Sequence, residues 1–176
     1  QPVEHYAALR AMPNVRFLRP GDPNEAAAAW GVAVARRHAP TVLAFTRQKL
    51  PVLAGSITGA AAGVRRGAYV LREATGAARM ILISTGSELH LAVAAAEQLE
   101  AAGTPTRVVS MPCWELFEEQ SPAYRSATVD PSTVRVAIEA AGPMGWERYT
   151  GAEGAFIGMR GFGASAPSKV LYEKFG

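Results

Sequence analysis

Short apolar runs alternate along the chain with longer segments in which apolar residues recur at helical spacing. The apolar runs lie at residues 15–19, 41–45, 80–84, 106–111, 134–138 and 155–159. Each run has the length and composition of a buried strand, and the segments between most of them have the period of a helix. Repeated strand, helix, strand units imply parallel pairing. We therefore predict an α/β fold with an open, mostly parallel sheet and helices on both faces.

Two of the predicted helices have clear boundaries. Asp22 fits the N-cap of the first, with Pro23 in its first turn and Glu25 placed to complete a capping box. The second begins near residue 89 and ends at Gly103, a residue suited to the left-handed conformation that follows a helix. A shorter helix is predicted around residues 114–120, with a break at Pro122.

Residues 53–66 differ in composition from the segments on either side. They contain Gly55, Gly59 and Gly63, three consecutive alanines and a pair of arginines, without a sustained strand or helix period. This composition predicts a linker. It divides the chain into residues 1–52 and residues 67–176.

Composition and charge exclude several classes of protein. The 176 residues are 49% hydrophobic and 19% charged, which excludes disorder, and the single Cys113 excludes an internal disulfide and favours a cytoplasmic protein. The net charge of +3 is spread along the chain, so we expect no nucleic-acid partner.

No apolar run is long enough to span a membrane and the start of the chain lacks a signal-peptide pattern, so we expect neither membrane insertion nor secretion. Because the chain starts at Gln1 rather than Met, we expect it to be part of a longer protein.

Three positions beyond predicted strands could bind a ligand. Arg47 follows the run at 41–45, where its guanidinium could bind a phosphate or carboxylate, or could simply be solvated or ion-paired. The turn at 85–88 could bind an anion at a helix start, but a capping role for Thr85 or Ser87 is favoured. Residues 161–166 match G-x-G-x-x-A, but Pro167 follows at once and a tight loop is favoured.

The other polar candidates indicate no complete site. The three histidines, His5, His38 and His90, lie too far apart in sequence to indicate a metal site, and Cys113 is expected to be a small core residue. Glu139 and Glu147 could be buried acids, although surface or ion-paired roles are favoured. Ser165 lacks the G-x-S-x-G motif of a hydrolase. The residues alone therefore indicate no catalytic group and no metal ligand.

A series of short segments resembles transketolases in order and spacing, across the whole chain. These segments are Gln1-Pro2-Val3-Glu4-His5, Arg19-Pro20, Asn24-Glu25, Thr46-Arg47-Gln48, Gly67-Ala68-Tyr69-Val70-Leu71, Ser84-Thr85-Gly86-Ser87-Glu88, Val108-Val109-Ser110-Met111-Pro112, Trp146-Glu147-Arg148-Tyr149 and Phe162-Gly163-Ala164-Ser165-Ala166-Pro167. The resemblance implies that residues 1–52 are the end of the pyrimidine-binding middle domain, that 53–66 are a linker and that 67–176 are the C-terminal domain. Residues 1–52 would then form a partial α/β domain that precedes the C-terminal domain.

The resemblance also implies an activity. Transketolases move a two-carbon ketol unit between ketose and aldose phosphates, using thiamine diphosphate with Mg²⁺ or Ca²⁺. The Gly-Asp-Gly cofactor motif and the glutamate that activates the aminopyrimidine are missing from this sequence, so we expect the chain alone to be inactive and to bind no cofactor. By its place in Thr46-Arg47-Gln48, Arg47 resembles the arginine that binds the substrate phosphate. Thr46 and Lys49 stand where the family usually has Ser and Asn, so substrate affinity could differ.

The expected partners are sugar phosphates in the intact enzyme, and a second copy of the chain or complementary transketolase domains. An incomplete first domain should expose an apolar face, which favours such association. Two other interpretations stay open: a stand-alone dimerisation or regulatory α/β module, and one subunit of a split transketolase-like enzyme.

Overall fold

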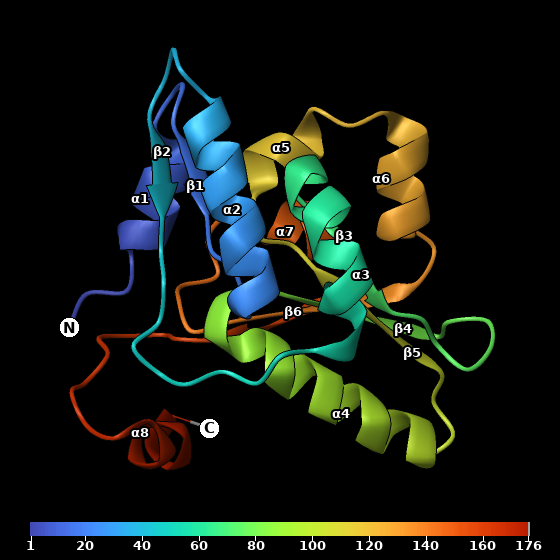
Figure 1. The fold of residues 1–176 in the computed structure, drawn as a ribbon. Helices are drawn as coiled ribbons and strands as arrows, with labels where there is room; N and C mark the ends of the chain where they lie inside the picture. Colours follow the sequence, from blue (N-terminus) through green and yellow to red (C-terminus); the bar gives the residue numbers. More distant parts are fainter. Residues whose placement is uncertain (176) are drawn as a thin grey trace.

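A computed structural model describes residues 1–175, which form two sheets flanked by helices (Figure 1). The smaller sheet pairs β1 (Arg16–Leu18) with β2 (Thr41–Leu43) in parallel. The larger sheet has the order β3-β5-β4-β6-β7, made of β3 (Tyr69–Arg72), β4 (Met80–Ser84), β5 (Thr106–Ser110), β6 (Val134–Glu139) and β7 (Ala155–Gly158). Only β3 runs antiparallel to its neighbour, so the predicted mostly parallel α/β sheet is confirmed.

Helices connect and cover these strands. They are α1 (His5–Ala11), α2 (Pro23–Ala35), α3 (Ala54–Gly63), α4 (Leu89–Ala101), α5 (Trp114–Glu118), α6 (Pro122–Thr128), α7 (Glu147–Thr150) and α8 (Ser168–Phe175), with single 3₁₀ turns η1 (Val64–Arg66) and η2 (Gly86–Glu88). None of the helices in residues 1–175 is long and apolar enough to cross a membrane.

The central strand β4 is buried on both faces, as its continuous apolar run predicts. Leu82 lies in a core with residues of α2, α3 and α4, whereas Ile81 and Ile83 lie in a second core with aromatic residues of α5 and α7. Leu18 of β1 belongs to the first of these cores, so the small sheet shares its apolar core with the large one.

The start of α2 follows its sequence signal. The Asp22 side chain accepts a hydrogen bond from the backbone N–H of Glu25 at 2.9 Å, and the Glu25 carboxylate accepts one from the N–H of Gly21 at 2.7 Å. The predicted capping box is therefore present, with the returning bond shifted to the residue before the cap.

The prediction that residues 53–66 form an irregular segment is wrong, because α3 and η1 occupy most of it. Gly55, Gly59 and Gly63 recur every four residues and share the face of α3 that meets β3. A Cβ on Gly55 would stand 1.9 Å from the carbonyl oxygen of Leu71, and one on Gly63 would stand 2.2 Å from the ring of Tyr69. The glycines that suggested a linker are what allows the helix to lie against the strand.

Two further differences lie in the C-terminal half. The predicted break before Pro122 is present, because α5 ends at Glu118, but Pro122 also begins a further helix, α6, that was not predicted. Ser121 is the N-cap of α6, and its side chain accepts from the N–H of Tyr124 at 3.2 Å. Helix α8, which was not predicted, follows the loop at 161–166 and has no buried residue. The loop lies beside the start of the chain, where Gln1 and Gly163 exchange two backbone hydrogen bonds of 2.7 and 2.8 Å.

Candidate functional site

Arg47 lies in the loop after β2, at the carboxyl ends of β1 and β2, where a ligand is expected in a parallel sheet. It lines a cavity of about 410 Å³. The other polar residues of this cavity are Tyr6, Arg19, Thr46, Gln48, Ser87 and Ser168. Arg47 is exposed, and no ion pair formed within residues 1–175 includes it. Its guanidinium is therefore available to an anionic ligand, which keeps the predicted phosphate-binding role open.

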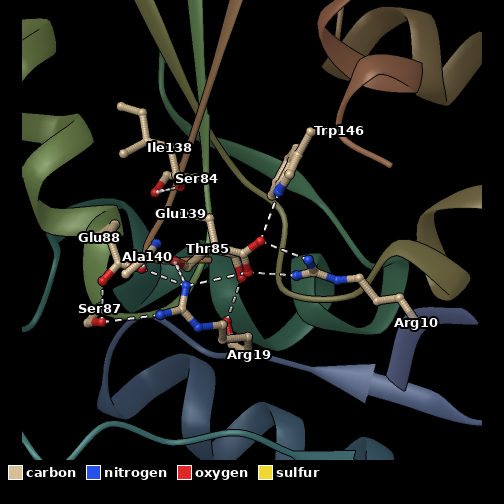
Figure 2. Close-up of polar contacts among 10 residues, drawn as sticks. All are labelled: Arg10, Arg19, Ser84, Thr85, Ser87, Glu88, Ile138, Glu139, Ala140 and Trp146. Atoms are coloured by element: carbon tan, nitrogen blue, oxygen red, sulfur yellow. Dashed lines mark hydrogen bonds and ion pairs between the residues drawn. The ribbon is translucent and has the colours of Figure 1, made fainter. Parts of the chain in front are cut away.

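Arg19 is the second arginine of the cavity, and it is buried (Figure 2). Its Nη1 lies 2.6 Å from the Glu88 carboxylate and 3.5 Å from that of Glu139, and it donates to the carbonyl of Thr85 at 3.0 Å. Burial alone would lower the pKa of Arg19, but the two carboxylates raise it above its ordinary value. Arg19 is thus a permanently charged residue that lines the cavity, and the carboxylates of Glu88 and Glu139 balance its charge.

Glu139, the last residue of β6, joins the first 19 residues of the chain to the large sheet. Both terminal nitrogens of Arg10 donate to its carboxylate at 2.8 Å, and Trp146 Nε1–H donates to it at 2.8 Å (Figure 2). Burial alone would raise the pKa of Glu139, but the hydrogen bonds and charge of Arg10, with the charge of Arg19, lower it. The favoured ion-paired role of Glu139 is confirmed, although the side chain is also fully buried, whereas Glu147 is exposed.

The turn at η2 does not cap its helix through a side chain, so the predicted role of Thr85 or Ser87 as a cap is wrong. The Thr85 hydroxyl donates to the carbonyl of Arg19 at 2.8 Å, and the Ser87 hydroxyl hydrogen-bonds to the carboxylate of Glu88. At Gly86, which has a φ of +63°, a Cβ would stand 2.5 Å from the guanidinium carbon of Arg19. The turn is shaped around Arg19, a residue 66 positions away that no local pattern could indicate.

A second buried acid, Glu25, lies at the start of α2. Its carboxylate accepts hydrogen bonds from the hydroxyls of Tyr69 at 2.8 Å and Ser110 at 2.5 Å. Burial raises the pKa of Glu25, and the hydrogen bonds from Ser110, Gly21 and Tyr69 oppose that rise in part. The local sequence indicates only the capping role of Glu25, because the two hydroxyl partners of its carboxylate lie 44 and 85 positions away.

The other candidates from the sequence, the histidines, Cys113 and Ser165, are not among the residues that line the Arg47 cavity. No group of three or more metal-binding side chains occurs among the residues that the structure describes. Cys113 is buried as predicted, and burial followed by the charge of Glu115 raises the pKa of its thiol. Ser165 accepts a hydrogen bond of 2.5 Å from the side chain of Gln1.

The fold and cavity define an α/β chain in which a short parallel pair of strands is joined to a five-stranded sheet by buried arginine and glutamate side chains. Residues 67–176 match the family model described as transketolase-like TK C-terminal domain, and residues 1–52 match that of the transketolase pyrimidine binding domain. The chain therefore belongs to the transketolase family.

Curated relatives and solved structures agree with this assignment. The chain is 49% identical over its whole length to a chloroplastic transketolase of Solanum tuberosum and 51% identical to a transketolase of Sinorhizobium medicae, covering 24% and 25% of those proteins. A transketolase structure from Leishmania mexicana matches 99% of the chain with a TM-score of 0.91 at 45% identity. The chain thus spans about a quarter of the length of these relatives. A split-gene transketolase, described as an inactive beta4 tetramer, shares the fold with a TM-score of 0.79 at 20% identity, and the chain covers 58% of it.

Proposed function

We propose that this chain is the C-terminal part of a thiamine-diphosphate-dependent transketolase, which moves two-carbon ketol units between ketose and aldose phosphates. The observation that carries the proposal is the identity of about half of all positions with transketolases over the whole chain, together with matches to two successive transketolase domains. Residues 1–52, 53–66 and 67–176 would be the end of the middle domain, the connection and the C-terminal domain. A cytoplasmic location fits this activity.

In the intact enzyme, thiamine diphosphate and a divalent metal would supply the carbanion chemistry, while the protein binds and orients the sugars. The cofactor diphosphate and its metal would be held by residues of the enzyme outside this sequence, because residues 1–175 offer no cluster of metal-binding side chains. The role of this chain is therefore to complete the substrate site and to support its geometry.

We assign Arg47 to the substrate phosphate. Three features support this role: its exposed guanidinium, its place at the carboxyl ends of β1 and β2, and its position on the cavity of about 410 Å³. A guanidinium binds phosphate through two parallel N–H bonds, whereas an ammonium offers only a point charge. Thr46 would hold the loop, since its hydroxyl accepts from the N–H of Gln48 at 3.1 Å.

The partners would be sugar phosphates and a protein surface that covers the small sheet. Trp30 of α2 and Phe45 after β2 stack at 6.1 Å between ring centroids, yet are 56% and 47% exposed, and Val34 beside them is 72% exposed. Apolar side chains gathered in this way are typical of a contact surface. Either a second copy of the chain or complementary transketolase domains would fit.

The proposal is tested by assaying ketol transfer from xylulose 5-phosphate to ribose 5-phosphate. We expect no transfer by the chain alone, and transfer when it is part of a polypeptide or complex that carries the missing cofactor-binding domain. Turnover by the chain alone would contradict the proposal that residues outside this sequence hold the cofactor and its metal. Activity restored by mixing with a separate cofactor-binding subunit would identify a split enzyme. A transketolase in which this chain replaces the enzyme's own C-terminal part should transfer ketol units, and a folded chimera without transfer would contradict the function itself.

A further inference from the structure

A second cavity, which the proposed function does not use, lies at the opposite end of β1 from Arg47. Its volume is about 430 Å³. We refer to it as the basic cavity, and it is lined by Arg16, Val32, Ala35, Arg36, Arg37, His38, Arg65 and Leu116. Arg16 is the first residue of β1, whereas the Arg47 cavity begins beyond its last residue. The two cavities are therefore separate.

The basic cavity carries an uncompensated positive charge. Arg16 is paired with Glu119 at 2.8 Å, but no acidic side chain is among the residues that line the cavity. Arg36 is held by the carbonyl oxygens of Pro40 at 2.6 Å and Asn14 at 3.0 Å, which fix the guanidinium without neutralising it. Four arginines thus meet around one cavity with a single acidic partner beside it.

Arg37 and Arg65 complete the rim. Both are exposed, and neither takes part in an ion pair within residues 1–175. The Arg65 side chain lies against α2, since its Nη2 would be 3.9 Å from a Cβ placed on Gly31. Arg65, which belongs to η1, therefore lies close to α2, and Arg36 and Arg37 directly follow the last residue of that helix. The three arginines line the same cavity.

The Nε of Arg16 is buried and has no hydrogen-bond partner among the described residues, although the Nη2 of the same guanidinium donates to both oxygens of Glu119. One nitrogen of this arginine is therefore left unsatisfied beside the cavity.

The floor of the cavity is apolar, which narrows the class of ligand. Val32 and Leu116 are 8% and 5% exposed, and Ala35 lies beside them. A volume of about 430 Å³ is within the range of sites for small organic molecules, and a lone phosphate would contact only the rim. Arginine both forms paired hydrogen bonds to phosphate and stacks on planar rings. The three arginines without an acidic partner match the charge of about −3 that a diphosphate group carries near neutral pH.

We propose that the basic cavity binds a nucleoside diphosphate, with Arg36, Arg37 and Arg65 on the phosphates and the base over the apolar floor. This site is independent of the proposed sugar-phosphate site at Arg47. Its failure would therefore leave the transketolase assignment untouched.

The proposal is tested by calorimetric titration of the complete protein with ADP, pyrophosphate and adenosine. We expect saturable binding of one ADP for each chain, and binding of pyrophosphate and adenosine each at least about tenfold weaker, because each meets only the rim or only the floor. Replacing two exposed arginines, Arg37→Ala with Arg65→Ala, should weaken ADP binding roughly tenfold or more without unfolding the protein.

Two control variants make the result specific. Arg125→Ala with Arg148→Ala alters a different arginine-bearing cavity, which also contains Glu118, and should leave ADP binding unchanged. Arg47→Ala should leave it unchanged as well. The proposal is overturned if ADP does not bind saturably, if pyrophosphate or adenosine binds as tightly as ADP, or if the Arg37 and Arg65 double variant binds ADP as the parent does.

Discussion

Glu139→Gln removes the negative charge on which two buried arginines depend, while keeping the size of the side chain. Glu139 is fully buried, and the side chains of Arg10 and Arg19 are each only 6% exposed, so solvent screens the pairs little. Arg19 keeps Glu88 as a partner at 2.6 Å, but Arg10 loses the only carboxylate that it pairs with among residues 1–175. In its place Arg10 meets an amide, whose NH₂ group is a donor facing the donors of the guanidinium. The charge of Arg10 is then uncompensated inside the molecule.

Removing one partner of a buried ion pair costs about 3–5 kcal/mol, which is a large part of the roughly 5–15 kcal/mol that stabilises a typical domain. We expect Glu139→Gln to lower the free energy of unfolding by that amount. Urea unfolding followed by tryptophan fluorescence is a suitable assay, because Trp146 donates to Glu139 and the Arg10 guanidinium lies 4.0 Å from the centre of the Trp114 ring.

The matched control is Glu119→Gln, which breaks the exposed pair with Arg16. The Glu119 side chain is 55% exposed, so this change should cost less than about 1 kcal/mol. Equal and small losses in the two variants would refute the view that the buried pairs hold the first residues of the chain to the large sheet.

Three other predictions concern pH and packing. Because the pKa of Glu139 is lowered on folding, its stabilisation is present above the unfolded value near 4.5 and is lost as pH falls through the lower folded value, so Glu139→Gln should flatten acid unfolding curves measured from pH 6 downwards. Because the pKa of Glu25 is raised, its contribution is full below the unfolded value and is lost as pH rises through the folded one; Glu25→Gln should remove that decline, and an unchanged pH profile would contradict it. Gly63→Ala should destabilise by about 1–3 kcal/mol through overlap with the Tyr69 ring, measured by urea unfolding against Gly76→Ala, where a Cβ meets nothing within 4 Å.

The parts of the fold that local sequence determines could be predicted from it. The run at β4 is apolar because both faces of the strand are buried, and the signal at Asp22 and Glu25 satisfies the first N–H groups of α2. The composition of residues 53–66 predicts a linker because glycine and alanine carry no apolar period, although here their small size is what packs α3 on Tyr69. Helix α8 is amphipathic but only 8 residues long and buries no side chain, so its pattern is too short to distinguish a helix from a loop.

In the candidate site, too, the residue that local sequence indicates could be predicted, whereas the ion pairs between distant residues could not. The position of Arg47 after a parallel strand, with the resemblance of Thr46-Arg47-Gln48 to a transketolase segment, was enough to single it out. The pairing of Arg10 with Glu139 joins residues 129 positions apart, and that of Arg19 with Glu88 depends on a turn shaped by Gly86. Such contacts exist only after the chain has folded, so no spacing rule could indicate them.

The most direct test of the account is the Michaelis constant of the complete enzyme for ribose 5-phosphate and for unphosphorylated ribose, in the parent and in Arg47→Ala. One charge-assisted contact to phosphate is worth about 1.5–3 kcal/mol, or roughly a tenfold to hundredfold change. The control is Arg79→Ala, an exposed arginine just before the amino end of β4, which should change neither constant. The account predicts that Arg47→Ala raises KM for ribose 5-phosphate by that factor and leaves KM for ribose unchanged. Equal effects on the two acceptors, or no effect on either, would contradict it.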